Sequence, residues 1–129
     1  MSTITPAPVV LIAEDDEDIR DLISWKLELA GYRTLQAGNG RAALALAHEH
    51  RPDAVVLDIG MPELDGIAVC RQLAEHAGTT DIPVLMLSGR TRDADIELGH
   101  AAGADDYMIK PFNPQDLLHR VNGLLAAAA

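Results

Sequence analysis

Carboxylate, hydroxyl and ammonium side chains each follow a short apolar run in this chain. They are Glu14-Asp15 after residues 9–13, Asp58 after residues 55–57, Ser88 after residues 82–87, and Lys110 after residues 105–109. Converging carboxylates repel one another, and a hard divalent cation such as Mg²⁺ relieves that repulsion. Lys110 adds a positive charge and Ser88 a hydroxyl donor, and both suit a phosphoryl group carried on a carboxylate nucleophile. The pattern therefore predicts a site for phosphoryl chemistry.

Asp58 lies in the most informative stretch of the chain, residues 52–66. Residues 55–57 are typical of a strand buried on both faces, residues 60–62 indicate a loop, and Asp65 can cap the following helix. Asp58 is thus expected at the carboxyl end of an inner strand, where open parallel sheets bind ligands. A strand-ending acid beside a turn is the ordinary alternative, but the companion groups at the same edge favour a functional site.

Strand and helix patterns alternate five times, with no repeat or internal linker. Strands are expected at residues 9–14, 32–37, 55–57, 82–87 and 105–109. Helices are expected after the caps Asp16, Asp65 and Asn113 and at residues 41–50 and 93–102. This alternation predicts a parallel sheet covered by helices on both faces.

Apolar residues at helical spacing predict an inward face for each helix. The stripe of the first helix is expected to comprise Ile19, Leu22, Ile23, Leu27 and Ala30, with Trp25 at its flank. The fourth helix is expected to turn Ala94, Leu98, Ala101 and Ala102 toward the sheet. The five histidines, at positions 48, 50, 76, 100 and 119, are expected to be exposed, because none pairs with another on one helix at metal-ligand spacing.

Composition narrows the class of protein further. A chain of 129 residues suits one domain, and its formal net charge of −10 argues against direct binding of nucleic acid. The lone cysteine, Cys70, favours a buried thiol and a reducing, cytoplasmic location. No apolar run reaches membrane-spanning length. Residues 1–8 are expected to form a disordered arm, and residues 126–129 a tail that is either a natural end or the start of a linker.

A set of short motifs occurs in an order and spacing that resemble the response-regulator receiver domains of two-component signalling, including the chemotaxis regulators. The motifs are Glu14-Asp15, Leu57-Asp58, Met61-Pro62, Asp65-Gly66, Leu87-Ser88, Gly103-Ala104-Asp105-Asp106-Tyr107 and Lys110-Pro111-Phe112. The resemblance runs over residues 9–125. It implies a flavodoxin-like, doubly wound (βα)5 fold with a five-stranded parallel sheet of order 2-1-3-4-5. Lys110-Pro111 is a candidate cis peptide bond.

The resemblance also implies roles for particular residues. Asp58 would accept a phosphoryl group from a histidine kinase or phosphotransfer protein. Mg²⁺ would be held by Asp15, Asp58 and the Gly60 backbone carbonyl, with Glu14 acting through a water. Ser88 and Lys110 would contact the phosphoryl oxygens. Tyr107 would turn inward with Ser88 as a switch.

The expected output is a change in the surface formed by the fourth helix, fifth strand and fifth helix, which would control a partner protein or output domain. Such a chain is a signalling domain and not an enzyme, apart from self-phosphorylation by small phosphodonors and self-dephosphorylation. It is expected to be a monomer or weak dimer that contacts neither membrane nor nucleic acid.

Two rival classes share parts of this pattern. A phosphatase or hydrolase with an aspartate nucleophile generally carries a second acid two residues after the nucleophile, where this chain has Gly60. A flavodoxin-type electron carrier needs a phosphate-cradling loop after the first strand, and the acidic run Glu14-Asp15-Asp16 would repel that phosphate. Both features favour the signalling domain.

Overall fold

Five short segments pair side by side as a parallel sheet in the computed structural model, which describes residues 6–89 and 93–128. The strands are β1 (Val9–Ala13), β2 (Arg33–Ala37), β3 (Ala54–Asp58), β4 (Val84–Ser88) and β5 (Asp106–Ile109). Their order is β2-β1-β3-β4-β5, and every pairing is parallel. The predicted topology is therefore confirmed, with β2 as a half-polar edge strand.

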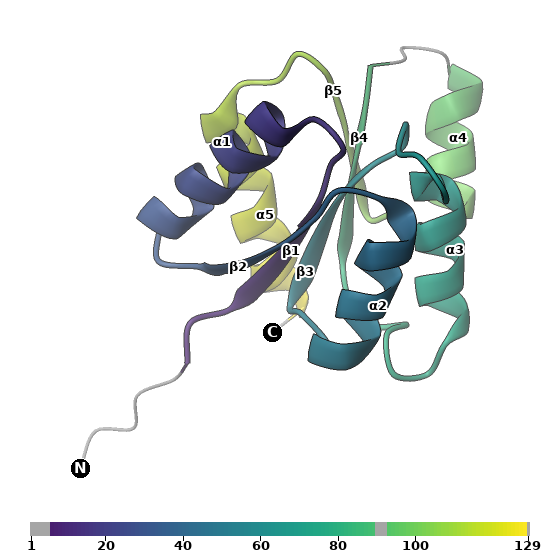
Figure 1. Cartoon of the computed structure of the whole chain (residues 1–129), viewed down its shortest axis with the longest axis horizontal. Helices are drawn as coiled ribbons and strands as arrows, with labels where there is room; N and C mark the ends of the chain where they lie inside the picture. Colours follow the sequence, from purple (N-terminus) through teal and green to yellow (C-terminus); the bar gives the residue numbers. More distant parts are fainter. Residues whose placement is uncertain (1–5, 90–92, 129) are drawn as a thin grey trace.

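Five helices cover the two faces of the sheet (Figure 1). They are α1 (Glu17–Leu29), α2 (Gly40–His50), α3 (Gly66–Glu75), α4 (Asp93–Ala101) and α5 (Pro114–Ala128). α1 and α5 pack on one face, and α2, α3 and α4 on the other. The side chains of Asp16, Asn39 and Asp65 accept backbone hydrogen bonds at the first turns of α1, α2 and α3.

The inner strand β3 contributes to both hydrophobic cores. Val55 and Leu57 pack in the core beneath α2 and α3, whereas Ala54 and Val56 pack in the core beneath α1 and α5. All four are almost fully buried, at 1% exposure or less. Packing from both sides fixes the strand, and with it the position of Asp58 at its end.

Two apolar faces differ from the sequence prediction. On α1, Ile23 and Leu27 are buried as expected, but Leu22 is 41% exposed and Trp25 58%. Together with Leu29 they form an exposed row at every third or fourth residue, which we call the α1 ridge.

On α4, the prediction for Leu98 and Ala101 was wrong, because Leu98 is 48% exposed and Ala101 is also exposed. Gly99 and Ala102 are buried in their place, and an added Cβ at Gly99 would lie 3.5 Å from the Tyr107 ring. The helix thus approaches β5 through its small residues, and this rotation turns the larger Leu98 outward.

The ends of the chain are only partly described. Arg33 donates hydrogen bonds to the carbonyls of Ala7 (3.0 Å) and Pro8 (2.9 Å), so the last residues of the expected arm lie against β2. Residues 1–5 of that arm lie outside the described residues. At the other end, α5 continues through Ala128.

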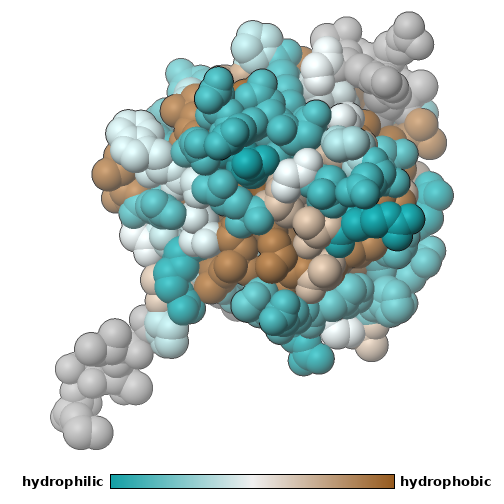
Figure 2. Space-filling model, viewed as in Figure 1, coloured by the Kyte–Doolittle hydropathy of each residue, from teal (hydrophilic) through white to brown (hydrophobic). Residues whose placement is uncertain are grey.

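The surface is mainly hydrophilic on the face seen in Figure 2, with apolar areas interspersed. Among residues 6–89 and 93–128, no helix is both long and apolar enough to cross a membrane. All five histidines are exposed, and Cys70 is buried, as the sequence predicted.

Candidate functional site

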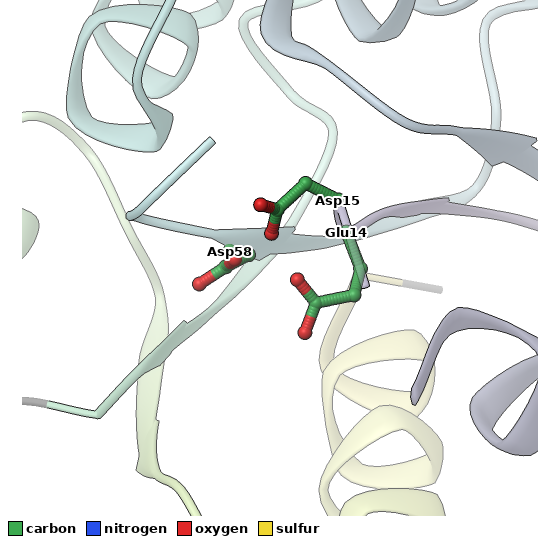
Figure 3. Close-up of side chains that lie close together, drawn as sticks. All are labelled: Glu14, Asp15 and Asp58. Atoms are coloured by element: carbon green, nitrogen blue, oxygen red, sulfur yellow. The ribbon is translucent and has the colours of Figure 1, made fainter. Parts of the chain in front are cut away.

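The strand register brings the acidic residues together. Ala13 of β1 lies opposite Leu57 of β3, so the next residues, Glu14 and Asp58, leave the sheet side by side. Ligand oxygens of Glu14, Asp15 and Asp58 all lie within 4.8 Å of one another. Figure 3 shows the three carboxylates gathered at the ends of the two strands. Glu14 and Asp58 are buried, at 0% and 5% exposure, whereas Asp15 is exposed to solvent.

Lys110 reaches the same cluster from the end of β5. Its backbone N–H donates to the Ser88 carbonyl at 2.8 Å, which holds the ends of β4 and β5 together. Its Nζ lies 3.3 Å from Oδ1 of Asp58 and forms an ion pair with Oε1 of Glu14. The Lys110-Pro111 peptide bond is cis, as the sequence suggested. Ser88 is buried at the end of β4, the strand adjacent to β3.

The electrostatics of the site are those of crowded acids with one neutralising cation. Burial, the largest cause, and the neighbouring Asp58 together raise the pKa of Glu14 to about 7, against the opposing effect of Lys110. Burial lowers the pKa of Lys110, but its hydrogen bond to Glu14 and the negative charges of Asp58 and Glu14 outweigh that effect and raise it. The cluster therefore holds Lys110 as an ammonium and still carries surplus negative charge.

A divalent cation fits this donor set. Among the residues that the structure describes, none donates a hydrogen bond to Oε2 of Glu14, although this oxygen is buried. A buried carboxylate oxygen without a partner is costly, and a cation or its bound water would satisfy it. Mg²⁺ prefers oxygen ligands and is commonly held by one or two carboxylates with several waters. Glu14, Asp15 and Asp58 have this chemistry.

The loop after β3 is held close to Asp58. The Gly60 N–H donates to Oδ1 of Asp58 at 3.3 Å. Further along, the Gly66 N–H donates to the Ile59 carbonyl at 2.9 Å, and α3 begins there. An added Cβ at Gly66 would lie only 2.3 Å from the Asp58 carbonyl oxygen, whereas one at Gly60 would meet nothing within 4 Å. The close approach of α3 therefore requires glycine at 66, and Gly60 leaves open space beside the carboxylate.

Tyr107 lies on β5, which β4 separates from β3. It is half-buried and packs with the core beneath α2 and α3. A hollow of about 500 Å³ lies between α4, β5 and α5, lined in part by Ile96, His100, Tyr107 and Phe112. Arg120 closes part of its rim by pairing with Asp106 at 2.8 Å.

The structure brings the predicted residues Glu14, Asp15, Asp58, Ser88 and Lys110 to one edge of the sheet, whereas Tyr107 lies within β5, and one contact was not foreseen. Lys110 was expected to serve a phosphoryl group, and the structure pairs it with Glu14 and Asp58. The signal was present in the charges alone, since a buried Glu14 needs a counter-charge and Lys110 is the cation at that edge.

Comparison with known proteins defines the class. The family model of the response regulator receiver domain matches residues 10–122. The chain therefore belongs to the response-regulator receiver domain family of two-component signalling, whose members are phosphorylation-dependent switches.

Individual relatives agree with this assignment. The chain is 45% identical over 118 residues to the DNA-binding dual master transcriptional regulator RpaA of Synechocystis sp., covering 92% of this chain and 49% of that protein. The chain thus spans about half the length of the curated relatives it matches.

Solved structures share the fold. A putative response regulator from Chloroflexus aurantiacus has a TM-score of 0.88 and 35% identity, covering 93% of this chain and 98% of its own. The receiver domain of a sensor histidine kinase from Pseudomonas aeruginosa PAO1, with a magnesium ion coordinated in its active site cleft, has a TM-score of 0.86 and 27% identity. That match covers 93% of this chain and 98% of the other.

Proposed function

We propose that this domain switches a signalling output when Asp58 accepts a phosphoryl group from a histidine kinase or phosphotransfer protein. The observation that carries the assignment is the position of Asp58. It is buried at the end of the central strand, its Oδ1 is 3.3 Å from the Lys110 ammonium, and two further carboxylates stand beside it. Among the described residues, Glu14, Asp15 and Asp58 form the one cluster of this kind.

In the transfer, a carboxylate oxygen of Asp58 attacks phosphorus, and the bond from phosphorus to the donor's imidazole nitrogen breaks. The electron pair of that bond returns to the donor, and Asp58 becomes an acyl phosphate. Lys110 stands beside the accepting oxygen and is positioned to pair with the added phosphoryl charge. Ser88, on the neighbouring strand, would donate its hydroxyl to a phosphoryl oxygen once phosphate is present.

We assign Asp15, Asp58 and the Gly60 carbonyl as the residues that would hold Mg²⁺ directly, with Glu14 acting through a bound water. When bound, the ion supplies positive charge to the transferring phosphoryl group. The crowded carboxylates and the unpartnered oxygen of Glu14 support this assignment. The magnesium in the active site cleft of the Pseudomonas receiver domain also supports it.

The output surface in this proposal is the face formed by α4, β5 and α5. Inward rotation of Tyr107, with movement of Ser88, would reshape the hollow lined by Ile96 and His100. The small residue Gly99 of α4 faces the Tyr107 ring. A movement of the ring would therefore change the packing between β5 and α4. The relatives' names indicate transcriptional regulators, so the controlled element would be an output domain or partner protein.

We place this action in the cytoplasm, where the thiol of the lone, buried Cys70 would remain reduced. The domain is proposed to work as a monomer or weak dimer, with no direct contact to nucleic acid because of its net charge of −10. Beyond its own phosphorylation and dephosphorylation, it would catalyse no reaction.

The test is phosphorylation by a small donor. The full chain is incubated with acetyl phosphate and Mg²⁺, and intact mass is measured for wild type and Asp58→Asn. We expect one phosphate on the wild type and none on the variant. Asp53→Asn, an exposed acid whose carboxylate caps the Val9 N–H, serves as the matched control and should be phosphorylated normally. Equal phosphate gain in wild type and Asp58→Asn would refute the assignment.

A further inference from the structure

Two histidines from different helices meet at the edge of the sheet opposite the acidic cluster. His48 lies in the last turn of α2, and His76 follows the last residue of α3. Because the helices run antiparallel to the strands, the ends of α2 and α3 lie at the opposite end of the sheet from the carboxyl end of β3 (Figure 1), where Asp58 is the last residue. The two ring centres are 5.0 Å apart, with the ring planes at 86°.

We propose that His48 and His76 form a binding site for a divalent transition-metal ion, with one imidazole from each helix. The site is separate from the proposed magnesium site, because it offers nitrogen in place of oxygen. Imidazole ligands suit Zn²⁺, Ni²⁺ and Cu²⁺, whereas Mg²⁺ prefers carboxylate and water.

The rings meet edge to face in the structure, and their separation, though not this orientation, suits coordination of one ion by both. An ion bound to an imidazole nitrogen lies roughly 3.2 Å from the ring centre, given a metal–nitrogen distance of about 2.0–2.1 Å. Two ring centres 5.0 Å apart then subtend about 100° at a common ion. This angle lies between the roughly 90° of square-planar and the roughly 109° of tetrahedral coordination. Both side chains are exposed, so rotation about their side-chain bonds can turn one nitrogen of each ring toward the ion.

The backbone beneath both rings is well anchored. The carbonyl of His76 accepts hydrogen bonds from the N–H groups of Thr79 (3.1 Å) and Thr80 (2.8 Å). The buried Thr79 hydroxyl in turn donates to the Leu73 carbonyl at 2.8 Å. His48 is held within α2, which packs on α3. A partly ordered pair of ligands lowers the entropic cost of binding, and an ion between them would fasten α2 to α3.

The site provides two protein ligands. Within residues 6–89 and 93–128, no third histidine, cysteine or carboxylate completes a cluster there. Water would occupy the remaining positions, so the ion would exchange with solvent. The affinity of the site for different metals should follow the general order of stability of divalent metal complexes, with Cu²⁺ bound more tightly than Ni²⁺ or Zn²⁺.

The experiment is titration calorimetry of the full chain with NiCl₂, in buffer with saturating Mg²⁺ to fill the acidic cluster. The variants are His48→Ala and His76→Ala, with His119→Ala as a matched control that removes an exposed histidine from α5. We expect one Ni²⁺ per wild-type chain, and a loss of affinity of about tenfold or more in each of the first two variants. The control and an Asp15→Asn variant should bind Ni²⁺ like the wild type.

A second readout tests the link between helices. Ni²⁺ should raise the melting temperature of the wild type and of His119→Ala, because it binds only the native pair, but not that of His48→Ala or His76→Ala. Circular dichroism without metal checks that all variants are folded. Unchanged binding in either His48→Ala or His76→Ala would overturn the shared site, as would loss of binding in Asp15→Asn. Absence of Ni²⁺ binding by the wild type would overturn it as well.

Discussion

Replacing Gly66 tests whether the first turn of α3 packs tightly against the end of β3 that carries Asp58. In Gly66→Ala, the new methyl group would lie 2.3 Å from the carbonyl oxygen of Asp58 and 2.9 Å from the Cα of Ile59. Both are backbone atoms of the segment that carries the proposed phosphoacceptor, so no side-chain rotation relieves the clash. The first turn of α3 must move away, which strains or breaks the hydrogen bond from the Gly66 N–H to the Ile59 carbonyl.

The expected destabilisation is the sum of two costs, the steric clash of the new methyl group and the weakened hydrogen bond. Overpacking costs about 1–3 kcal/mol and a lost hydrogen bond about 0.5–1.5 kcal/mol, so we expect destabilisation of about 2–4 kcal/mol. For a domain of this size, that lowers the melting temperature by roughly 8–16 °C. The displaced loop should also slow phosphorylation of Asp58 by acetyl phosphate.

The matched control is Gly123→Ala in the exposed part of α5, where an added Cβ meets nothing within 4 Å. Alanine in a helix interior is favoured over glycine by about 0.5–1 kcal/mol, so this variant should be slightly more stable than wild type. Thermal unfolding followed by circular dichroism compares the two. A Gly66→Ala protein that melts at the wild-type temperature would show that the contact between α3 and β3 is not tight.

Three further outcomes are expected. Asp15→Asn should abolish the rise in melting temperature that Mg²⁺ produces in the wild type, and an unchanged rise would place the ion elsewhere. Gly60→Met should slow the decay of phospho-Asp58, because its side chain would fill open space beside the carboxylate and hinder the approach of water. About 1.4 kcal/mol of added barrier gives a tenfold effect, and equal decay rates would mean that this position does not control lifetime. Burial, reinforced by the negative charge of Asp105, raises the pKa of Cys70 to about 11. The thiol therefore stays neutral at pH 8, and iodoacetamide should modify it only after unfolding in urea; rapid reaction of the native protein would contradict this.

The parts of the fold that could be predicted are those where local pattern and global packing agree. The apolar run before Asp58 ends on an acid, and no other element type suits so short a segment buried on both faces. Once strand order is known, Glu14 and Asp58 must lie together. The charges indicate a counter-ion for Glu14, but the ion pair with Lys110 also depends on side-chain directions across β3 and β4, which separate β1 from β5, and linear spacing does not reveal these.

Helix rotation was the weaker part of the prediction, for a physical reason. The prediction for α4 assumed that the largest apolar side chain, Leu98, faces the sheet. In the structure Gly99 faces the Tyr107 ring, so the helix approaches β5 through a small residue and Leu98 lies on the outer face. Likewise, His48 and His76 are far apart in the chain, and only the packing of α2 against α3 makes them neighbours.

The α1 ridge has a consequence for the colloidal behaviour of the protein. Leu22, Trp25 and Leu29 expose apolar surface along one side of a helix, and such surface favours contact between molecules. At pH 7 the formal net charge of −10 keeps copies apart. That repulsion vanishes near the isoelectric point of about 4.7 and is screened by concentrated salt. Mildly acidic or high-salt solutions should therefore promote clustering through α1 while the fold itself remains intact.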